Sequence, residues 1–244
     1  MKKKILPEKW ESLTLTDGFI FAQVMKNPEL CKTLLEKLLG LSIEKIEYIE
    51  DEKTIDLRYD SKGVRLDVYV KGSDAIYNLE IQRSDTYELP QRSRAYQSLI
   101  DLDSLLTGED YKGIKGSYVV FICMEDIFKR GQYRYSFQNK CEEVDGLNLD
   151  DGTHKIFFNT KGTKGHIDPD IKAFLDYLEG EIVDNPFVKK LDEEVKKVKR
   201  SEHLKMQHAA LFYRDRDNYR KGREEGREES IIKTIKHHEG FRCR

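Results

Sequence analysis

The sequence predicts an α/β fold with a mixed sheet, and three observations lead to this prediction. Segments between residues 54 and 83 alternate apolar and polar residues with a period of two, which is typical of antiparallel strands. The later run SYVVFICM, residues 117–124, is almost wholly apolar, which favours a strand buried on both faces and paired in parallel. Helical patterns precede the alternating segments and separate them from this run.

The first helices are expected within the stretch TDGFIFAQVMKNPELCKTLLEKLLG, residues 16–40. Thr16 and Asp17 are candidates for the N-cap, and apolar residues then recur at helical spacing. Pro28 divides the stretch into two helices, and Gly40 is expected to end the second one.

The alternating segments are TIDLRY from residue 54, VRLDVYV from residue 64 and IYNLEIQR from residue 76. The turn-rich pieces DSKG and KGSD join them, so we expect an antiparallel meander. A helix follows over residues 90–106, before the buried strand. Two later alternating segments, YRYSFQNKCEEV and THKIFFNTKG, are expected to form a further hairpin or to extend the sheet.

The C-terminal part is predicted to be helical. A helix is expected over residues 168–180, and from Asn185 onward the chain is helix-forming and highly charged, with the tandem repeat GREEGREE at 222–229. We therefore predict a main domain over residues 1–165 and a charged helical extension over residues 166–244. A solvated surface helix and a partner-binding or self-associating helix both remain open.

Composition excludes some classes of protein. The 43 basic and 45 acidic residues nearly balance, so any contact with phosphate must be a local patch. The four cysteines are scattered, which indicates reduced thiols in the cytoplasm and argues against a structural zinc site. Neither a signal-peptide pattern nor an apolar run long enough for a bilayer is present in the sequence, so no membrane partner is expected.

The second and third alternating segments carry an acidic face. Alternation places Asp67 and Glu80 opposite the apolar faces of their strands, and the tightest loop compatible with KGSD sets them directly opposite each other. The same reasoning across DSKG pairs Ile55 with Val68 and brings Asp56 beside Asp67. Carboxylates about 5 Å apart repel by about 3 kcal/mol at an effective dielectric constant of about 20.

Two explanations of this repulsion remain open. The face could be solvated and neutralised by Arg58 and Arg65, with nothing bound. Alternatively, a divalent cation could lie between Asp67 and Glu80, since Mg²⁺ is typically held by one or two carboxylates and keeps several waters. Spacing does not decide between them.

The order of helix, three strands, helix and strand resembles the core of the PD-(D/E)XK nucleases, a restriction-endonuclease-like three-layer α/β/α fold with a mixed sheet. More narrowly, the chain is similar to the PD-(D/E)XK nuclease family transposases, also called Rpn-type recombination-promoting nucleases, from about residue 15 to residue 229. The segments that carry this similarity are TDGFIFAQVMKNPEL, RLDVYV, YNLEIQR, RSRAYQSLI, SYVVFICM and the GREEGREE tail.

The resemblance implies a cytoplasmic DNA endonuclease dependent on Mg²⁺ or Mn²⁺ and associated with recombination or mobile elements. Asp67 matches the metal-binding Asp, and Glu80 matches the acidic position of the acidic-x-Lys tripeptide. Gln82 stands where most of the superfamily has Lys, as is common in the narrower family. Gln82 cannot act as a general base at neutral pH, but it can position a water or a phosphate oxygen by hydrogen bonding.

Further residues are candidates for supporting roles. Asp17 matches an acidic residue of the family's first helix, although an N-cap role also fits, and Asp56 and Asp17 are candidates for a second metal site or for support of the first. For Arg92, Arg94 and Tyr96, which match the family's second helix, phosphate contact and packing or salt-bridge support both remain open. The segment FKRGQYRYSFQNK could contact phosphates through Lys129, Arg130 and Arg134, or it could be an ordinary amphipathic strand with these basic residues on its solvated face.

A different class of function also fits the sequence. A nuclease-derived fold could keep the carboxylates and act without catalysis, as a binding or assembly module that works through its helical tail. A homo-oligomer formed by the C-terminal helices is compatible with either function.

Overall fold

The computed structural model describes residues 10–55, 64–84, 88–106 and 110–240 of the 244-residue chain. Residues 13–198 form one compact unit, and residues 10–12 together with 199–240 belong to a second. The predicted division after residue 165 stays a prediction. Along the chain the elements are η1 (Trp10–Ser12), α1 (Gly18–Met25), α2 (Pro28–Leu39), β1 (Ile46–Ile55), β2 (Val64–Gly72), β3 (Ala75–Gln82), α3 (Leu89–Leu106), β4 (Gly116–Cys123), β5 (Arg134–Phe137), β6 (Thr153–Asn159), α4 (Pro169–Leu178), α5 (Pro186–Arg200) and α6 (Glu202–Gly240).

The two N-terminal helices of the larger unit begin and end where the sequence predicts. The Asp17 carboxylate caps α1 by accepting hydrogen bonds from two backbone N–H groups of its first turn, at 3.1 and 3.2 Å. Asn27 caps α2 in the same way, with Pro28 in the first turn. Gly40 ends α2 at φ +70°, a left-handed conformation that glycine adopts without strain.

Six strands form one mixed sheet in the order β1-β2-β3-β4-β6-β5. The first three strands are antiparallel, β3, β4 and β6 are parallel, and β5 lies antiparallel to β6 at the edge. The parallel pairing predicted for residues 117–124 and the extension of the sheet by the later segments are therefore confirmed. Gln82, Cys123 and Asn159 are register partners at the ends of the parallel strands, and we call this end of the sheet the carboxyl edge.

The first strand differs from the prediction. Its bounds are Ile46–Ile55, so the segment expected from residue 54 covers only its end. Ile55 pairs with Val64, and the predicted pairing of Ile55 with Val68 is wrong by four residues. Alternation defines the faces of two strands but not the length of the connection between them, here residues 56–63. Asp56 itself lies outside the described residues.

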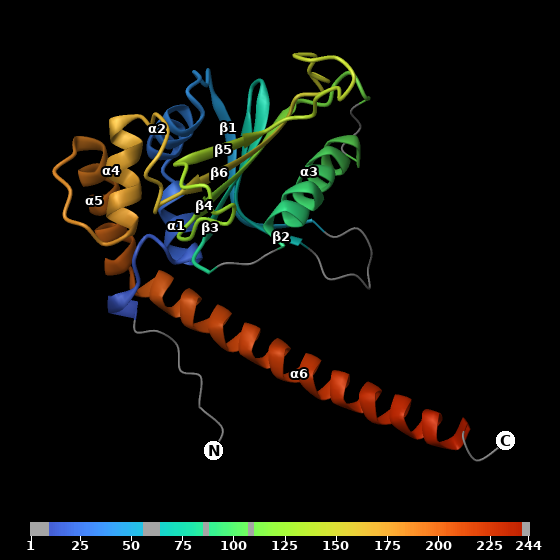
Figure 1. The fold of residues 1–244 in the computed structure, drawn as a ribbon. Helices are drawn as coiled ribbons and strands as arrows, with labels where there is room; N and C mark the ends of the chain where they lie inside the picture. Colours follow the sequence, from blue (N-terminus) through green and yellow to red (C-terminus); the bar gives the residue numbers. More distant parts are fainter. Residues whose placement is uncertain (1–9, 56–63, 85–87, 107–109, 241–244) are drawn as a thin grey trace. The chain divides into compact units, whose positions relative to one another are not determined.

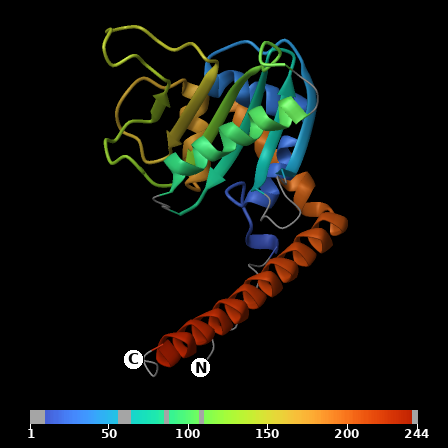
Figure 2. The ribbon, with the colours of Figure 1, turned by 90° about the vertical axis from the view of Figure 1, so that its right-hand side faces the viewer.

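Helices cover both faces of the sheet, with α3 on one face and α1, α2 and α4 on the other (Figure 1). Figure 2 shows α3 running across the sheet face that is turned toward the viewer. Beneath α3, Tyr96 and Ile100 pack against Phe121 and Phe157, whose rings stack with centroids 5.3 Å apart. The three-layer α/β/α class that the resemblance implies is thereby confirmed.

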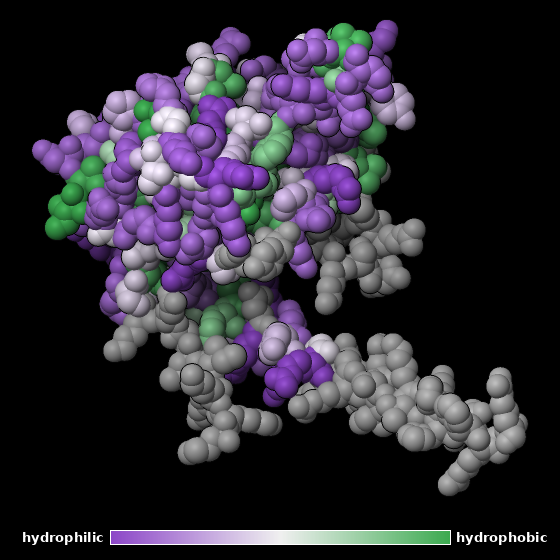
Figure 3. Space-filling model, viewed as in Figure 1, coloured by the Kyte–Doolittle hydropathy of each residue, from purple (hydrophilic) through white to green (hydrophobic). Residues whose placement is uncertain are grey.

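The helices α4 and α5, which follow the sheet in sequence, lie in the layer on the face opposite to α3 (Figure 1). The helix predicted over residues 168–180 is α4, and Phe174 from this helix packs near Phe187 of α5, with ring centroids 6.5 Å apart. Lys37 of α2 forms an ion pair with Asp170 of α4 at 2.5 Å. The surface visible in Figure 3 is mostly hydrophilic over the described residues, with separate hydrophobic spots.

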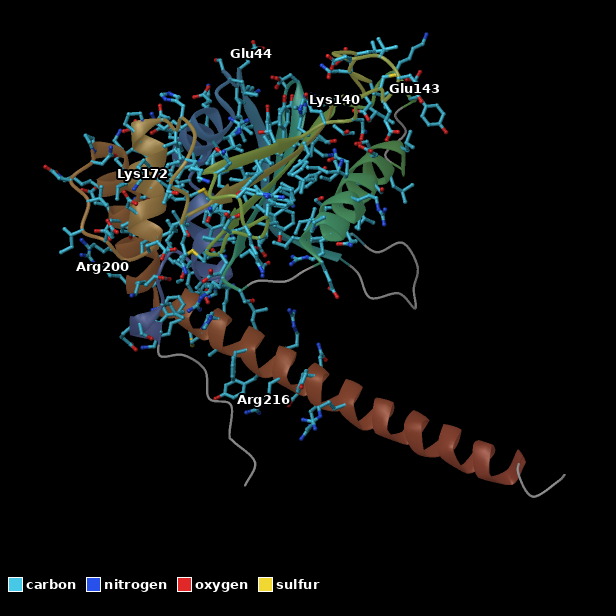
Figure 4. All side chains as sticks on the ribbon, viewed as in Figure 1. Glu44, Lys140, Glu143, Lys172, Arg200 and Arg216 are labelled. Atoms are coloured by element: carbon cyan, nitrogen blue, oxygen red, sulfur yellow. The ribbon has the colours of Figure 1, made fainter. Side chains whose placement is uncertain are left out.

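A long excursion, residues 138–152, connects β5 to β6 at the end of the sheet where β4 and β6 begin, which we call the amino edge. Lys140 and Glu143 mark it in Figure 4. Residues 138–152 contain one lysine, Lys140, and five exposed acidic residues: Glu142, Glu143, Asp145, Asp150 and Asp151. The amino edge therefore carries a surplus of negative charge.

The smaller unit combines η1 with α6. The Trp10 indole N–H donates a hydrogen bond to the Lys199 carbonyl oxygen at 2.9 Å, and Glu11 pairs with Lys205 at 3.0 Å. α6 extends over 39 residues, which confirms the predicted helical C-terminal region. Within the part of the chain that the structure describes, no helix combines the length and the apolar character needed to cross a bilayer.

Candidate active site

The candidate site lies where β2 and β3 part. Val68 faces Leu79 and Val70 faces Tyr77, which confirms the predicted register between these strands. At the next position the Asp67 backbone N–H donates to Glu80 Oε1 at 3.0 Å, and the Ile81 N–H donates to Asp67 Oδ2 at 3.4 Å. Each carboxylate thus accepts a hydrogen bond from the backbone of the opposite strand, and the two side chains are held together.

Glu80 is deeply buried, with only 3% of its surface exposed. Its Oε1 also accepts a hydrogen bond from the Asn78 side-chain amide at 3.2 Å, and its Oε2 lies 3.5 Å from Arg92 Nη2. Burial, followed by repulsion from Asp67, raises the pKa of Glu80 to about 8, because the hydrogen bonds and the Arg92 charge offset these effects only in part. The alternative of a solvated acidic face is wrong for Glu80, since α3 covers it.

Asp67 is half-buried and lies at the N-terminus of α1. A Cβ atom placed on Gly18 would lie 3.7 Å from Asp67 Oδ2, so the absence of a side chain leaves room beside this carboxylate. The partial positive charge of a helix N-terminus stabilises a nearby anion. Asp17 occupies the N-cap position next to Gly18, so the N-cap role is shown, and its candidacy for metal support stays a prediction.

Arg92 reaches the site from the first turns of α3. Its Nη1 donates to Gln82 Oε1 at 2.9 Å, and its Nε and Nη2 donate to the Tyr96 hydroxyl at 3.2 and 2.7 Å. Gln82 in turn donates from its amide to the Ser84 carbonyl oxygen at 3.1 Å. Within the described part of the chain, one N–H of Arg92 Nη1 keeps no protein partner. The Arg92 guanidinium is therefore held in place and keeps one N–H group for a further hydrogen bond.

Tyr96 supports Arg92 from one helical turn further along α3. Its ring is buried, stacks on Phe121 with centroids 5.9 Å apart, and lies 5.4 Å from the Arg92 guanidinium carbon. Spacing of i and i+4 places both side chains on the helix face that meets the sheet. Arg94, two residues after Arg92, is exposed. Of the two arginines predicted on this helix, only Arg92 contacts Glu80 among the described residues.

The other predicted basic residues lie apart from the carboxylates. Lys129 and Arg130 are exposed in the loop that follows β4 at the carboxyl edge. Arg134 pairs with Phe158 in the sheet and lies 5.8 Å from its ring, on the face opposite to α3. The structure therefore brings Asp67, Glu80, Gln82, Arg92 and Tyr96 together and leaves the remaining candidates outside.

Asn78 and Gly18 are site neighbours that the sequence interpretation missed. Asn78 is fully buried and donates directly to Glu80. Alternation could have found it, because it lies two residues before Glu80 and hence on the same face of β3. Gly18 carries no such signal, since its proximity to Asp67 arises from the packing of α1 on the sheet.

The side chains at this site suit a hard divalent cation. Asp67 and Glu80 supply carboxylate oxygens, the ligands that Mg²⁺ prefers, and a cation between them would offset their mutual repulsion, which adds to burial in raising the pKa of Glu80. Among the described residues no three His, Cys, Asp or Glu side chains form a metal-binding group. Asp67 and Glu80 would therefore provide a two-carboxylate site with positions left for water.

Comparisons with known proteins give one match. A search of curated proteins and a search of solved structures find no counterpart for this chain. A family model described as PD-(D/E)XK nuclease family transposase matches residues 19–231, which include every residue of the candidate site except Asp17 and Gly18. The match covers most of the chain, and the chain belongs to the PD-(D/E)XK nuclease family transposases.

Proposed function

We propose that the chain is a DNA endonuclease that uses Mg²⁺ or Mn²⁺ to hydrolyse phosphodiester bonds, in recombination or in the movement of mobile elements. The reciprocal hydrogen bonding of Asp67 and Glu80 carries this proposal, because it converges two carboxylates at a point where the strands part. Membership of a nuclease family supports the same reaction.

Asp67 and Glu80 would hold the metal ion. When bound, the ion polarises a phosphoryl oxygen and lowers the pKa of a coordinated water. Asn78 fixes one oxygen of Glu80, and the N-terminus of α1 stabilises the negative charge of Asp67. The hydrogen bonds that the strand backbones supply keep both carboxylates in position before substrate arrives.

Arg92 supplies the positive charge that the superfamily's Lys would provide. Its spare Nη1 donor can contact a phosphate oxygen as negative charge develops there. Gln82 accepts a hydrogen bond from the same guanidinium group, so its role in this chain is to orient Arg92. A neutral amide at position 82 and an arginine from α3 together replace a lysine on the strand.

Nicking of supercoiled plasmid DNA tests this function. We expect the full-length chain to nick plasmid with Mg²⁺ or Mn²⁺ and to lose this activity in EDTA. Asp67→Asn and Glu80→Gln preserve side-chain shape but remove the charges that hold the ion, so both should be inactive. Asp74→Asn, in the exposed turn between the same two strands, is the matched control and should nick as the wild type does.

The outcomes separate catalysis from a binding role. Nicking that persists in both site variants would show a contaminating nuclease and contradict the proposal. Absence of nicking with either ion, together with self-association that depends on α6, would instead favour the non-catalytic assembly module.

A further inference from the structure

A hydrogen-bonded turn, residues 126–131, follows β4 at the carboxyl edge, and we call it the basic turn. The Asp126 carboxylate accepts hydrogen bonds from the backbone N–H groups of Phe128, Lys129 and Gly131, at 3.1, 2.9 and 2.7 Å. The Tyr135 hydroxyl donates to the same carboxylate at 2.8 Å. The backbone of the turn is therefore held by Asp126 and Tyr135, without the side chains of Lys129 or Arg130.

Lys129 has an unfavourable backbone conformation for its residue type. Its φ is +54°, in the left-handed region that glycine and asparagine tolerate and that other side chains adopt at a cost. Backbone strain of this kind is concentrated at functional sites. A lysine at this position lowers stability relative to glycine, which points to a role for its charge.

A second loop adds another cation beside the basic turn. The backbone N–H groups of Thr163 and Lys164 donate to the Gly131 carbonyl oxygen at 2.8 and 2.9 Å. Lys164 is exposed, as are Lys129 and Arg130. Lys161 in the same loop forms an ion pair with Glu125 at 2.6 Å, so its charge is largely neutralised, unlike that of Lys164. Three exposed cations thus gather on two hydrogen-bonded loops.

These loops are at the same edge of the sheet as the candidate active site. The Met124 N–H, just before the basic turn, donates to the Gln82 carbonyl oxygen at 2.9 Å. The strand β6, which leads to Lys164, is two positions from β3, a distance of about 10 Å at the usual strand spacing. The excess of carboxylates lies at the opposite, amino edge, so of these two edges the carboxyl edge with its basic turn is the one that favours a polyanion.

We propose that the basic turn, together with Lys164, binds backbone phosphates of double-stranded DNA and positions the duplex across the carboxyl edge toward Asp67 and Glu80. This inference rests on the proposed function for its choice of ligand. The contacts are to phosphates, so they position the duplex and do not read its sequence.

Fluorescence anisotropy with a labelled duplex in EDTA tests the inference, because no cleavage occurs without metal. Lys129→Asn combined with Arg130→Gln removes two charges and keeps a residue that tolerates the left-handed conformation. We expect an affinity about tenfold lower and a salt dependence whose slope falls by about two. The matched control, Lys112→Asn with Lys140→Gln, removes two exposed charges near the amino edge and should bind as the wild type does.

A separate variant, Lys129→Gly, distinguishes a binding role from a structural one. It should raise the midpoint of thermal unfolding by relieving the strained conformation and should still weaken DNA binding. The inference would be overturned if the double variant bound DNA with the affinity and the salt dependence of the wild type. Failure of the wild-type chain to bind DNA would also overturn it. Because the assay requires no catalysis, DNA binding that depends on the basic turn would stand even if plasmid nicking failed.

Discussion

Asp67 and Glu80 hold each other across two strands, each accepting a backbone hydrogen bond from the strand of the other, at 3.0 and 3.4 Å. At this point between β2 and β3, carboxylate oxygens accept the hydrogen bonds that backbone carbonyl oxygens accept elsewhere in the sheet. Two groups that repel when ionised are thereby fixed side by side, with Glu80 buried and Asp67 half-buried, and a bound cation would offset their repulsion.

Arg92→Lys should lower the nicking rate about 100-fold, because lysine keeps the charge but loses the planar group that contacts Gln82, Tyr96 and Glu80 together. Steady-state plasmid nicking measures kcat, and we expect KM to change much less. Arg94→Lys on the exposed side of α3 is the control. A kcat for Arg92→Lys equal to that of the wild type would refute the role of the guanidinium.

Tyr96→Phe should slow nicking about tenfold by removing the hydroxyl that accepts two bonds from Arg92, while the ring keeps its stacking on Phe121. The free energy of unfolding should fall by about 1 kcal/mol, the usual contribution of a hydrogen bond. Tyr177→Phe, which removes a hydroxyl bonded to Asp192 at 3.0 Å, should cost similar stability without slowing nicking. Equal rates for both variants would mean that Tyr96 acts only through stability.

Asn78→Leu should weaken Mn²⁺ binding about 10- to 100-fold, because Glu80 Oε1 loses the amide that orients it. Isothermal titration calorimetry measures the affinity directly and needs no catalysis. Gln97→Leu is the control, since Gln97 of α3 is another buried amide but donates to Ser117. If both variants bind Mn²⁺ equally well, Asn78 has no specific role at the site.

The raised pKa of Glu80 predicts a pH dependence of stability in the metal-free protein. Because the folded-state value is about 8 and the ordinary value is 4.5, the stabilising contribution is fully present below 4.5 and is lost as the pH rises through 8. The free energy of unfolding of the wild type, relative to that of Glu80→Gln, should therefore fall as the pH rises from 4.5 to 8. Urea unfolding of both proteins measures this difference. Saturating Mg²⁺ at the upper end should stabilise the wild type more than the variant. A difference that does not change with pH would contradict the buried, raised-pKa carboxyl.

Two strand registers show how far the sequence alone could lead. Across KGSD, both strands alternate and the loop is short, so only one register gives a tight turn. Asp67 and Glu80 could therefore be predicted as neighbours. Across residues 56–63 the same method is wrong by four residues, because it requires a loop length that the sequence does not reveal. The helix boundaries at Asp17, Pro28 and Gly40 were predictable, since capping and backbone preferences act within a few residues.

By itself the sequence determined the order of the elements, the faces of β2 and β3 and the family, because these depend on local periodicity and on motifs along the chain. Only the tertiary structure decided that Glu80 is buried beneath α3 and that Arg92, not Arg94, meets it. It also placed Gly18 beside Asp67. These contacts depend on how helices pack on the sheet, and that packing is settled by the collective burial of side chains distant in sequence.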